Sequence, residues 1–233
     1  MSTLRHLAIA FSAAAMLAAS SAHGAELLLN GGFEAPAIGA GNYSYPGLPY
    51  GNVSLTSAYQ DHWTYEGSAL VGGGASNPWY YNTPPTGGDG SQQFVALQGT
   101  STLAQTFTMS GSILDVSWLS AGRPGNGNND GDQSYKVTLG ALTSPDYFSF
   151  SGQNFVNKSA HFAGLTNGAQ YTLTFVGVDA NPAGAGIRDQ TAFIDRISAV
   201  GSVPEASTWA LMLVGFGGLG AMLRHRRAVF AAA

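Results

Sequence analysis

The middle of the chain repeats one pattern, a short run of β-prone residues followed by Gly, Pro, Asn or Asp. Within residues 170–178, Leu173 and Phe175 alternate with Thr172 and Thr174, as in a strand with one buried face. No amphipathic helix longer than about two turns stands out. The predicted strands are residues 91–97, 102–108, 112–119, 134–139, 147–151, 154–162, 170–178 and 191–200. About eight short strands with turn residues between them predict an all-β fold, a β-sandwich or jelly roll.

The N-terminal residues 1–24 have the features of a secretory signal peptide. Arg5 gives a positive start, and residues 7–19 form an almost unbroken apolar run that is short for a membrane span. Small residues precede Ala25, so we expect cleavage before Ala25. Cleavage after Ala22 is the alternative, and an uncleaved signal helix acting as an anchor is a further one.

The C-terminal residues divide into a polar hinge (203–208), an apolar Gly-rich run from Trp209 to Leu223, and a basic end. A helix over residues 207–223 has about 17 residues, near the lower limit for a membrane span. This pattern predicts a C-terminal transmembrane helix. Because basic clusters stay on the cytoplasmic side, we expect residues 228–233 to lie in the cytoplasm. The predicted membrane stop consists of Arg224, Arg226 and Arg227.

Residues 25–202 remain between these ends, enough for one domain with a full core. The chain has no cysteine, which excludes disulfides and thiolate metal sites. Between Ala25 and Val203 there are five basic and 12 acidic residues, whereas the whole chain has a net charge of −4. An acidic domain without a basic stripe argues against nucleic acid as a partner.

Residues 203–227 read Val-Pro-Glu-Ala-Ser-Thr-Trp-Ala-Leu-Met-Leu-Val-Gly-Phe-Gly-Gly-Leu-Gly and end on a basic stop. This order resembles the PEP-CTERM sorting tail of bacterial surface proteins, although Ala206 stands where that family has a second Pro. The resemblance implies an exosortase-type processing enzyme as partner, transient insertion in the inner membrane and delivery to the envelope or extracellular space. We expect the short span to be removed after sorting, and permanent anchoring is the alternative. The expected sorting residues are Pro204, Glu205, Ser207, Thr208 and Trp209.

The domain opens with Leu-Leu-Asn-Gly-Gly-Phe-Glu (28–34) and closes with Asp-Gln-Thr-Ala-Phe-Ile-Asp-Arg-Ile (189–197). Together with the motifs between them, these resemble the galactose-binding-like jelly roll of many carbohydrate-binding modules. The resemblance implies that first and last strands lie close together and that Glu34 and Asp195 hold a structural Ca²⁺ with backbone carbonyls, a donor set that Ca²⁺ accepts. The alternative is that Glu34 pairs with Arg196 or caps a turn.

Aromatic residues gather in the predicted loop 72–82, where burial needs a reason. We expect sugar contacts from Trp79, Tyr80, Tyr81 and Arg123; the alternative is that the aromatic rings fold back over the edge of the sandwich. Trp63 and Trp118 are predicted to be core residues instead.

Catalytic motifs are not evident. His62 and His161, the histidines of the predicted mature domain, have neither a Ser nucleophile motif nor a metal-binding partner four residues on. The sequence therefore predicts a non-enzymatic, exported envelope or matrix protein that contacts exopolysaccharide. The alternatives are a glycan-acting extracellular hydrolase and a purely structural surface protein.

Overall fold

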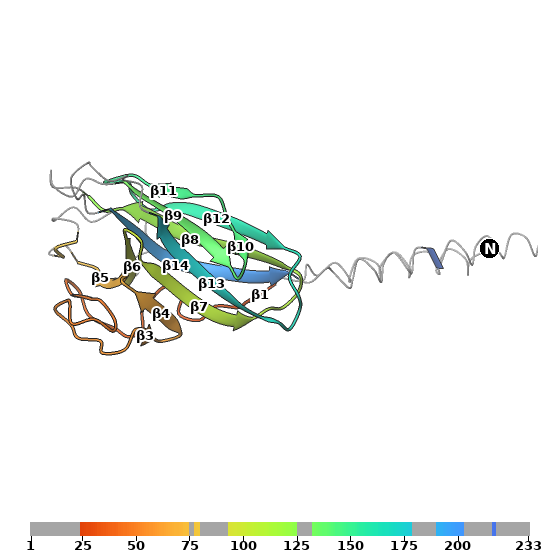
Figure 1. Ribbon diagram of the computed structural model, residues 1–233, viewed down its shortest axis with the longest axis horizontal. Helices are drawn as coiled ribbons and strands as arrows, with labels where there is room; N and C mark the ends of the chain where they lie inside the picture. The colour runs from red at the N-terminus through yellow and green to blue at the C-terminus, as the bar shows by residue number, and fades with distance from the viewer. Residues whose placement is uncertain are drawn as a thin grey trace, which may run out of the picture. The chain divides into compact units, whose positions relative to one another are not determined.

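The computed structural model describes residues 24–74, 77–79, 93–124, 132–178, 190–202 and 216–217. These form two sheets whose strands all pair antiparallel (Figure 1). In order across the sheet, sheet A contains β12 (Val156–Ala163), β8 (Ile113–Gly122), β14 (Thr191–Ser202), β6 (Gln93–Gln98), β5 (Ala69–Gly72) and β2 (Tyr43–Ser44), with β1 (Ala25–Glu26) beside β14. Sheet B contains β10 (Leu142–Thr143), β9 (Gln133–Leu139), β13 (Gln170–Val178), β7 (Thr102–Thr108), β4 (Trp63–Glu66) and β3 (Tyr59–Gln60), with β11 (Tyr147–Ser149) beside β9.

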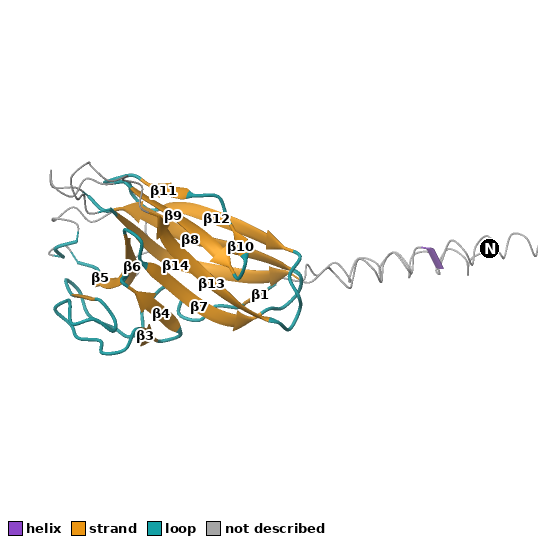
Figure 2. Cartoon of the chain, in the orientation of Figure 1, coloured by secondary structure: helices purple, strands orange, loops and turns teal. Residues whose placement is uncertain are grey.

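The expected all-β jelly-roll sandwich is confirmed, and Figure 2 shows that strands dominate the described part of the chain. The predicted bounds of β7 and β13 are those observed, and the other six predicted strands appear with shifts of a few residues. Strands β1 to β5 and β10 were not predicted. The expected signal helix and transmembrane helix lie outside the described residues. Among the residues described, no helix combines the length and the hydropathy needed to cross a membrane.

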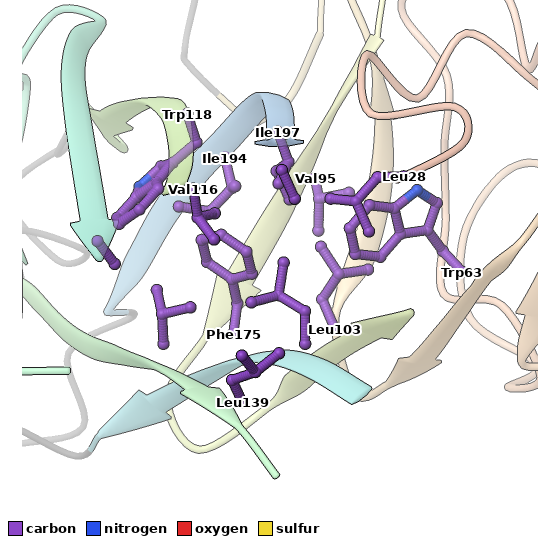
Figure 3. Close-up of a cluster of buried hydrophobic side chains, with 14 of the residues drawn as sticks. Leu28, Trp63, Val95, Leu103, Val116, Trp118, Leu139, Phe175, Ile194 and Ile197 are labelled. Carbon is purple, nitrogen blue, oxygen red and sulfur yellow. The ribbon is translucent and has the colours of Figure 1, made fainter. Parts of the chain in front are cut away.

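The main core lies between the two sheets and is built from inward-facing residues of both (Figure 3). On β13, Leu173 and Phe175 are fully buried while the neighbouring Thr172 and Thr174 are not, as the alternation predicted. Trp63 and Trp118 are both core residues, which confirms that prediction. The indole nitrogen of Trp118 donates to the hydroxyl of Tyr135 at 2.9 Å, so its burial leaves no polar atom unpaired.

A second hydrophobic cluster covers the other face of sheet A. Phe193 of β14 belongs to it, whereas its neighbour Ile194 belongs to the main core, so the two residues face opposite sides of the sheet. Sheet A is therefore buried on both faces at this end. The cluster consists of Ala69, Val71, Trp79, Phe94, Ala96, Ala121 and Phe193.

The first and last segments of the domain lie side by side, as the resemblance implied. Ala25 pairs with Gly201, and the N–H of Ile197 donates to the carbonyl of Gly31 at 2.9 Å (Figure 1). A Cβ at Gly31 would lie 1.9 Å from the Ile197 carbonyl oxygen, so only glycine permits this approach. Residues Ala25–Gly201 form one compact unit.

Candidate functional site

Two of the predicted sugar-contact residues, Trp79 and Arg123, come together at one end of sheet A. The Arg123 guanidinium carbon lies 4.7 Å from the centre of the Trp79 ring, and its Nε donates to the Trp79 carbonyl at 3.0 Å. The N–H of Arg123 donates to Thr191 at the start of β14. We call this pair the Trp79–Arg123 corner. A cation over an indole face and a hydrogen bond from the same side chain fix it in one orientation.

The backbone before Trp79 is held by side-chain amides rather than by a strand. Asn77 donates from Nδ2 to the carbonyl of Gly72 at 2.6 Å, and its Oδ1 accepts from the Trp79 N–H at 2.9 Å. Asn side chains commonly close turns in this way. The Trp79 ring then packs against Tyr43 and Phe193.

Both residues of the Trp79–Arg123 corner are largely buried, so they expose little surface to a ligand. Trp79 is 4% exposed and Arg123 is 8% exposed. Such burial is compatible with the alternative given above, in which the aromatic rings of this loop fold back over the edge of the sandwich. Sugar contact by this group stays a prediction, and its remaining members, Tyr80 and Tyr81, lie outside the described residues.

Both predicted calcium ligands lie near the start of β6 in the chain's pairing pattern. Glu34 accepts from the N–H of Gln93 at 3.1 Å. Asp195 follows Ile194, which pairs with Val95 of β6, and its Oδ1 accepts from the N–H of Arg196 at 2.7 Å. Asp195 is only 1% exposed, and a carboxylate buried so deeply needs hydrogen bonds or a cation. Carboxylate oxygens are ligands that Ca²⁺ accepts, and a calcium ion held by Glu34 and Asp195 stays a prediction.

Side-chain clusters typical of transition metals are not found: the described residues contain no group of three or more His, Cys, Asp and Glu placed to hold a metal ion. His161 pairs instead with Asp115, at 2.7 Å between Nδ1 and Oδ1. Both side chains are about three-fifths exposed, at 60% and 62%, so water weakens the interaction.

Gln93 is a structural residue that the sequence did not single out. Its side chain is buried and closes the loop that carries Glu34, accepting from Ile38 N at 2.6 Å and donating to the carbonyls of Phe33 at 2.5 Å and Pro36 at 3.0 Å. A polar residue at the first position of a hydrophobic strand was the available signal.

Two of the hollows on the described surface are lined entirely by described residues. One, of about 430 Å³, lies over sheet A and includes the charged residues Glu26 and Arg196. The other, of about 480 Å³, lies beside β7 and includes Tyr59, His62 and Thr106. Neither contains Trp79 or Arg123, so the sequence predicted neither.

The comparison with solved structures finds carbohydrate-binding modules. TmCBM61 in complex with β-1,4-galactotriose shares 14% identity at a TM-score of 0.44, over 76% of this chain and 99% of that chain. The CBM36-1 domain of a multidomain xylanase from the hindgut metagenome of Trinervitermes trinervoides has 15% sequence identity and a TM-score of 0.36. The match covers 52% of this chain and 88% of that chain. A family 35 carbohydrate-binding module from Clostridium thermocellum has 7% sequence identity and a TM-score of 0.39. The match covers 60% of this chain and 92% of that chain. At such TM-scores these likenesses carry no functional conclusion for this chain.

No curated protein matches the chain. Residues 202–227 match the model of the PEP-CTERM protein-sorting motif. The matched range contains the predicted sorting residues (204, 205 and 207–209) and the predicted membrane stop (224, 226 and 227), all of which lie outside the described residues. The chain thus carries a PEP-CTERM sorting motif, which indicates export, transient membrane anchoring and sorting to the envelope or the extracellular space.

Proposed function

We propose that this protein is a non-enzymatic component of the cell envelope or extracellular matrix that contacts polysaccharide. The observation that carries the proposal is that the sorting motif begins at residue 202, where the last strand of the sandwich, β14, ends. The β-sandwich therefore leads directly into the sorting motif, with no separate linker between them. A fold does not fix a function, so contact with a polymer has to be argued from particular residues and tested.

The first partner in this proposal is an exosortase-type enzyme that recognises residues 204–209 and acts while the apolar run lies in the inner membrane. The test is the mass of the protein recovered from strains with and without such an enzyme. We expect loss of the residues beyond the hinge only when the enzyme is present. Ala206→Pro restores the family pattern and should speed processing; an unprocessed product in both strains would instead support permanent anchoring.

The second partner is exopolysaccharide, contacted at the loop end where the Trp79–Arg123 corner lies. Tyr80 and Tyr81 follow Trp79 directly, and two adjacent tyrosines supply flat rings for sugar CH groups together with hydroxyl groups. Tyr80→Ala and Tyr81→Ala should reduce retention on immobilised exopolysaccharide, whereas Phe148→Ala, an exposed aromatic on β11, should not. Equal retention of all variants would remove these tyrosines from the proposal.

The hydrolase alternative is decided by incubating the protein with a panel of polysaccharides and measuring reducing ends. We expect no release above that of a heat-denatured sample. Release that depends on native protein would establish an enzyme. Failure to retain any glycan, with no hydrolysis, would leave the structural surface protein as the function.

Calcium at Glu34 and Asp195 belongs to the same proposal. An ion that binds only the folded state raises stability according to its concentration and affinity. We therefore expect the melting temperature to fall when a chelator is added and to recover with excess Ca²⁺. Glu34→Gln should remove this response. An unchanged melting temperature in chelator would show that the two carboxylates are satisfied by protein groups alone.

A further inference from the structure

The hollow beside β7 lies where sheet B is incomplete. β4 pairs with β7 up to the pair Thr64↔Ala104, and in the described part of the chain no strand pairs with residues 105–108 on that side. The N-terminal segment and the turn between β3 and β4 border the gap. The result is an open depression of about 480 Å³, within the range of roughly 300–1,000 Å³ common for small-molecule sites.

The floor of this hollow is rich in hydroxyl groups. Thr106 of β7 and Thr172 of β13 are direct cross-strand partners, and their Oγ1 atoms lie 2.8 Å apart. Both side chains are exposed, and Thr64 and Thr108 also line the hollow. Paired hydroxyls can each donate or accept, so they offer hydrogen bonds of either direction to a ligand.

One wall is formed by residues 27–29 and is held rigidly. The buried side chain of Gln105 accepts from the Leu29 N–H at 2.8 Å and donates to the Leu29 carbonyl at 2.9 Å. The indole nitrogen of Trp63, itself in the core, donates to the same carbonyl at 3.1 Å. These contacts fix the backbone while leaving the Leu29 side chain 55% exposed. The wall is therefore preformed, which lowers the entropic cost of binding.

The opposite rim is the tight turn between β3 and β4. Its two central residues, Asp61 and His62, have φ of 41° and 78°, as a two-residue type I′ hairpin requires. Such turns normally contain glycine, so two larger residues here are conformationally strained. The turn places His62 at the hollow and leaves the ring of Tyr59, which also lines it, 56% exposed.

The chemistry of the lining selects the ligand. Within the described residues the lining contains no Asp, Glu, Lys or Arg, unlike the hollow over sheet A. An exposed tyrosine ring beside hydroxyl and imidazole groups is suited to a sugar ring, whose CH groups stack on the aromatic face while its hydroxyls hydrogen-bond. An acidic polymer finds no cation here, and the acidic domain repels it.

We propose that this hollow, with Tyr59 as the stacking ring and Thr106 and Thr172 as hydrogen-bonding groups, binds a neutral polysaccharide chain. The inference rests on the proposed contact with polysaccharide and assigns that contact to a place separate from the Trp79–Arg123 corner. Because the hollow is open to solvent, it accepts internal units of a polymer and does not need a free chain end.

Affinity electrophoresis of the mature protein, purified from cells that express the full chain, tests the inference. The gels contain a neutral galactan, xylan or β-glucan, or acidic alginate. We expect retardation by at least one neutral polymer and not by alginate. Tyr59→Ala and Thr106→Val should weaken this binding by about tenfold or more, since each removes a central contact. Thr106→Val keeps the shape and the β-propensity of the side chain, so it remains decisive if Tyr59→Ala disturbs the turn.

The matched control is Thr174→Val, also on β13 but outside the hollow, which should bind within about twofold of the parent protein. Full binding by Thr106→Val with weakened binding by Tyr80→Ala would overturn the hollow and leave the proposed function intact. Retardation by alginate alone would overturn the neutral class of ligand. Absence of retardation in every gel would overturn both the hollow and the proposed polysaccharide contact.

Discussion

Replacing Gln93 should show how much a single buried amide contributes to this domain. Gln93 is 2% exposed, and its side chain makes three hydrogen bonds to the loop of residues 33–38. Gln93→Leu keeps the size of the side chain but leaves one N–H and two carbonyl groups without their partners. Buried backbone groups in this state are costly because they have lost water without gaining a hydrogen bond.

The expected loss in the free energy of unfolding follows from those three unpaired backbone groups. Each orphaned group costs about 1–3 kcal/mol, and the loop can relax toward water to recover part of this. The expected loss is therefore about 3–5 kcal/mol. For a domain of this size, each kcal/mol lowers the melting temperature by about 2–4 °C, so a fall of roughly 6–20 °C should be measurable.

Urea denaturation followed by tryptophan fluorescence gives the free energy, and hydrogen exchange of the Ile38 N–H reports on the loop itself. Gln170→Leu is the control, because Gln170 is an exposed strand residue whose replacement should change stability by about 0.5 kcal/mol or less. A loss below about 1 kcal/mol for Gln93→Leu, with slow exchange at Ile38, would refute the reasoning.

Three further outcomes are expected. The Tyr65 hydroxyl is buried and has no hydrogen-bond partner within the described structure, so Tyr65→Phe should leave stability unchanged or raise it by up to about 2 kcal/mol in urea denaturation. Burial raises the pKa of Tyr65 and Tyr135 above 10.0, while the unfolded tyrosines ionise near 10. Stability should therefore be full below about pH 10 and fall above it, and melting curves of Tyr65→Phe should show a smaller fall. Phe175→Ala, in the centre of the core, should cost about 3–5 kcal/mol, whereas Phe150→Ala, at 60% exposure, should cost little when both are measured in urea.

The strands that the sequence predicted are those whose own pattern is strong. In β13, polar and apolar residues alternate from Gln170 to Phe175, and both bounds of the strand were predicted. β1, β2 and β3 have two residues each, which is too short for any periodicity. Their positions are set by partners far away in the sequence, such as Gly201 for Ala25, so local reasoning could not find them.

The candidate sites were also predicted only in part, because each depends on contacts between residues far apart in the sequence. Trp79 and Arg123 were predicted from residue type, but the contact between them joins positions 44 residues apart and depends on where β8 ends. The hollow beside β7 was missed because it collects Tyr59, Thr106 and Thr172 from three strands. Single threonines on strands carry no signal of their own, since β-branched residues are common there for reasons of propensity.

The pairing of the two ends predicts that this domain would tolerate the expected cleavage at both. Cleavage before Ala25 leaves the pair Ala25↔Gly201 intact, and the Glu26 carboxylate still accepts the N–H of Ala199 at 2.8 Å. Removal of the tail beyond residue 202 likewise takes nothing from β14. The Trp79–Arg123 corner joins β14 at its other end, at Thr191. The eleven steps from Thr191 to Ser202, at about 3.3 Å each, put roughly 36 Å between the two ends of this strand. The Trp79–Arg123 corner and the start of the sorting motif therefore belong to opposite ends of β14.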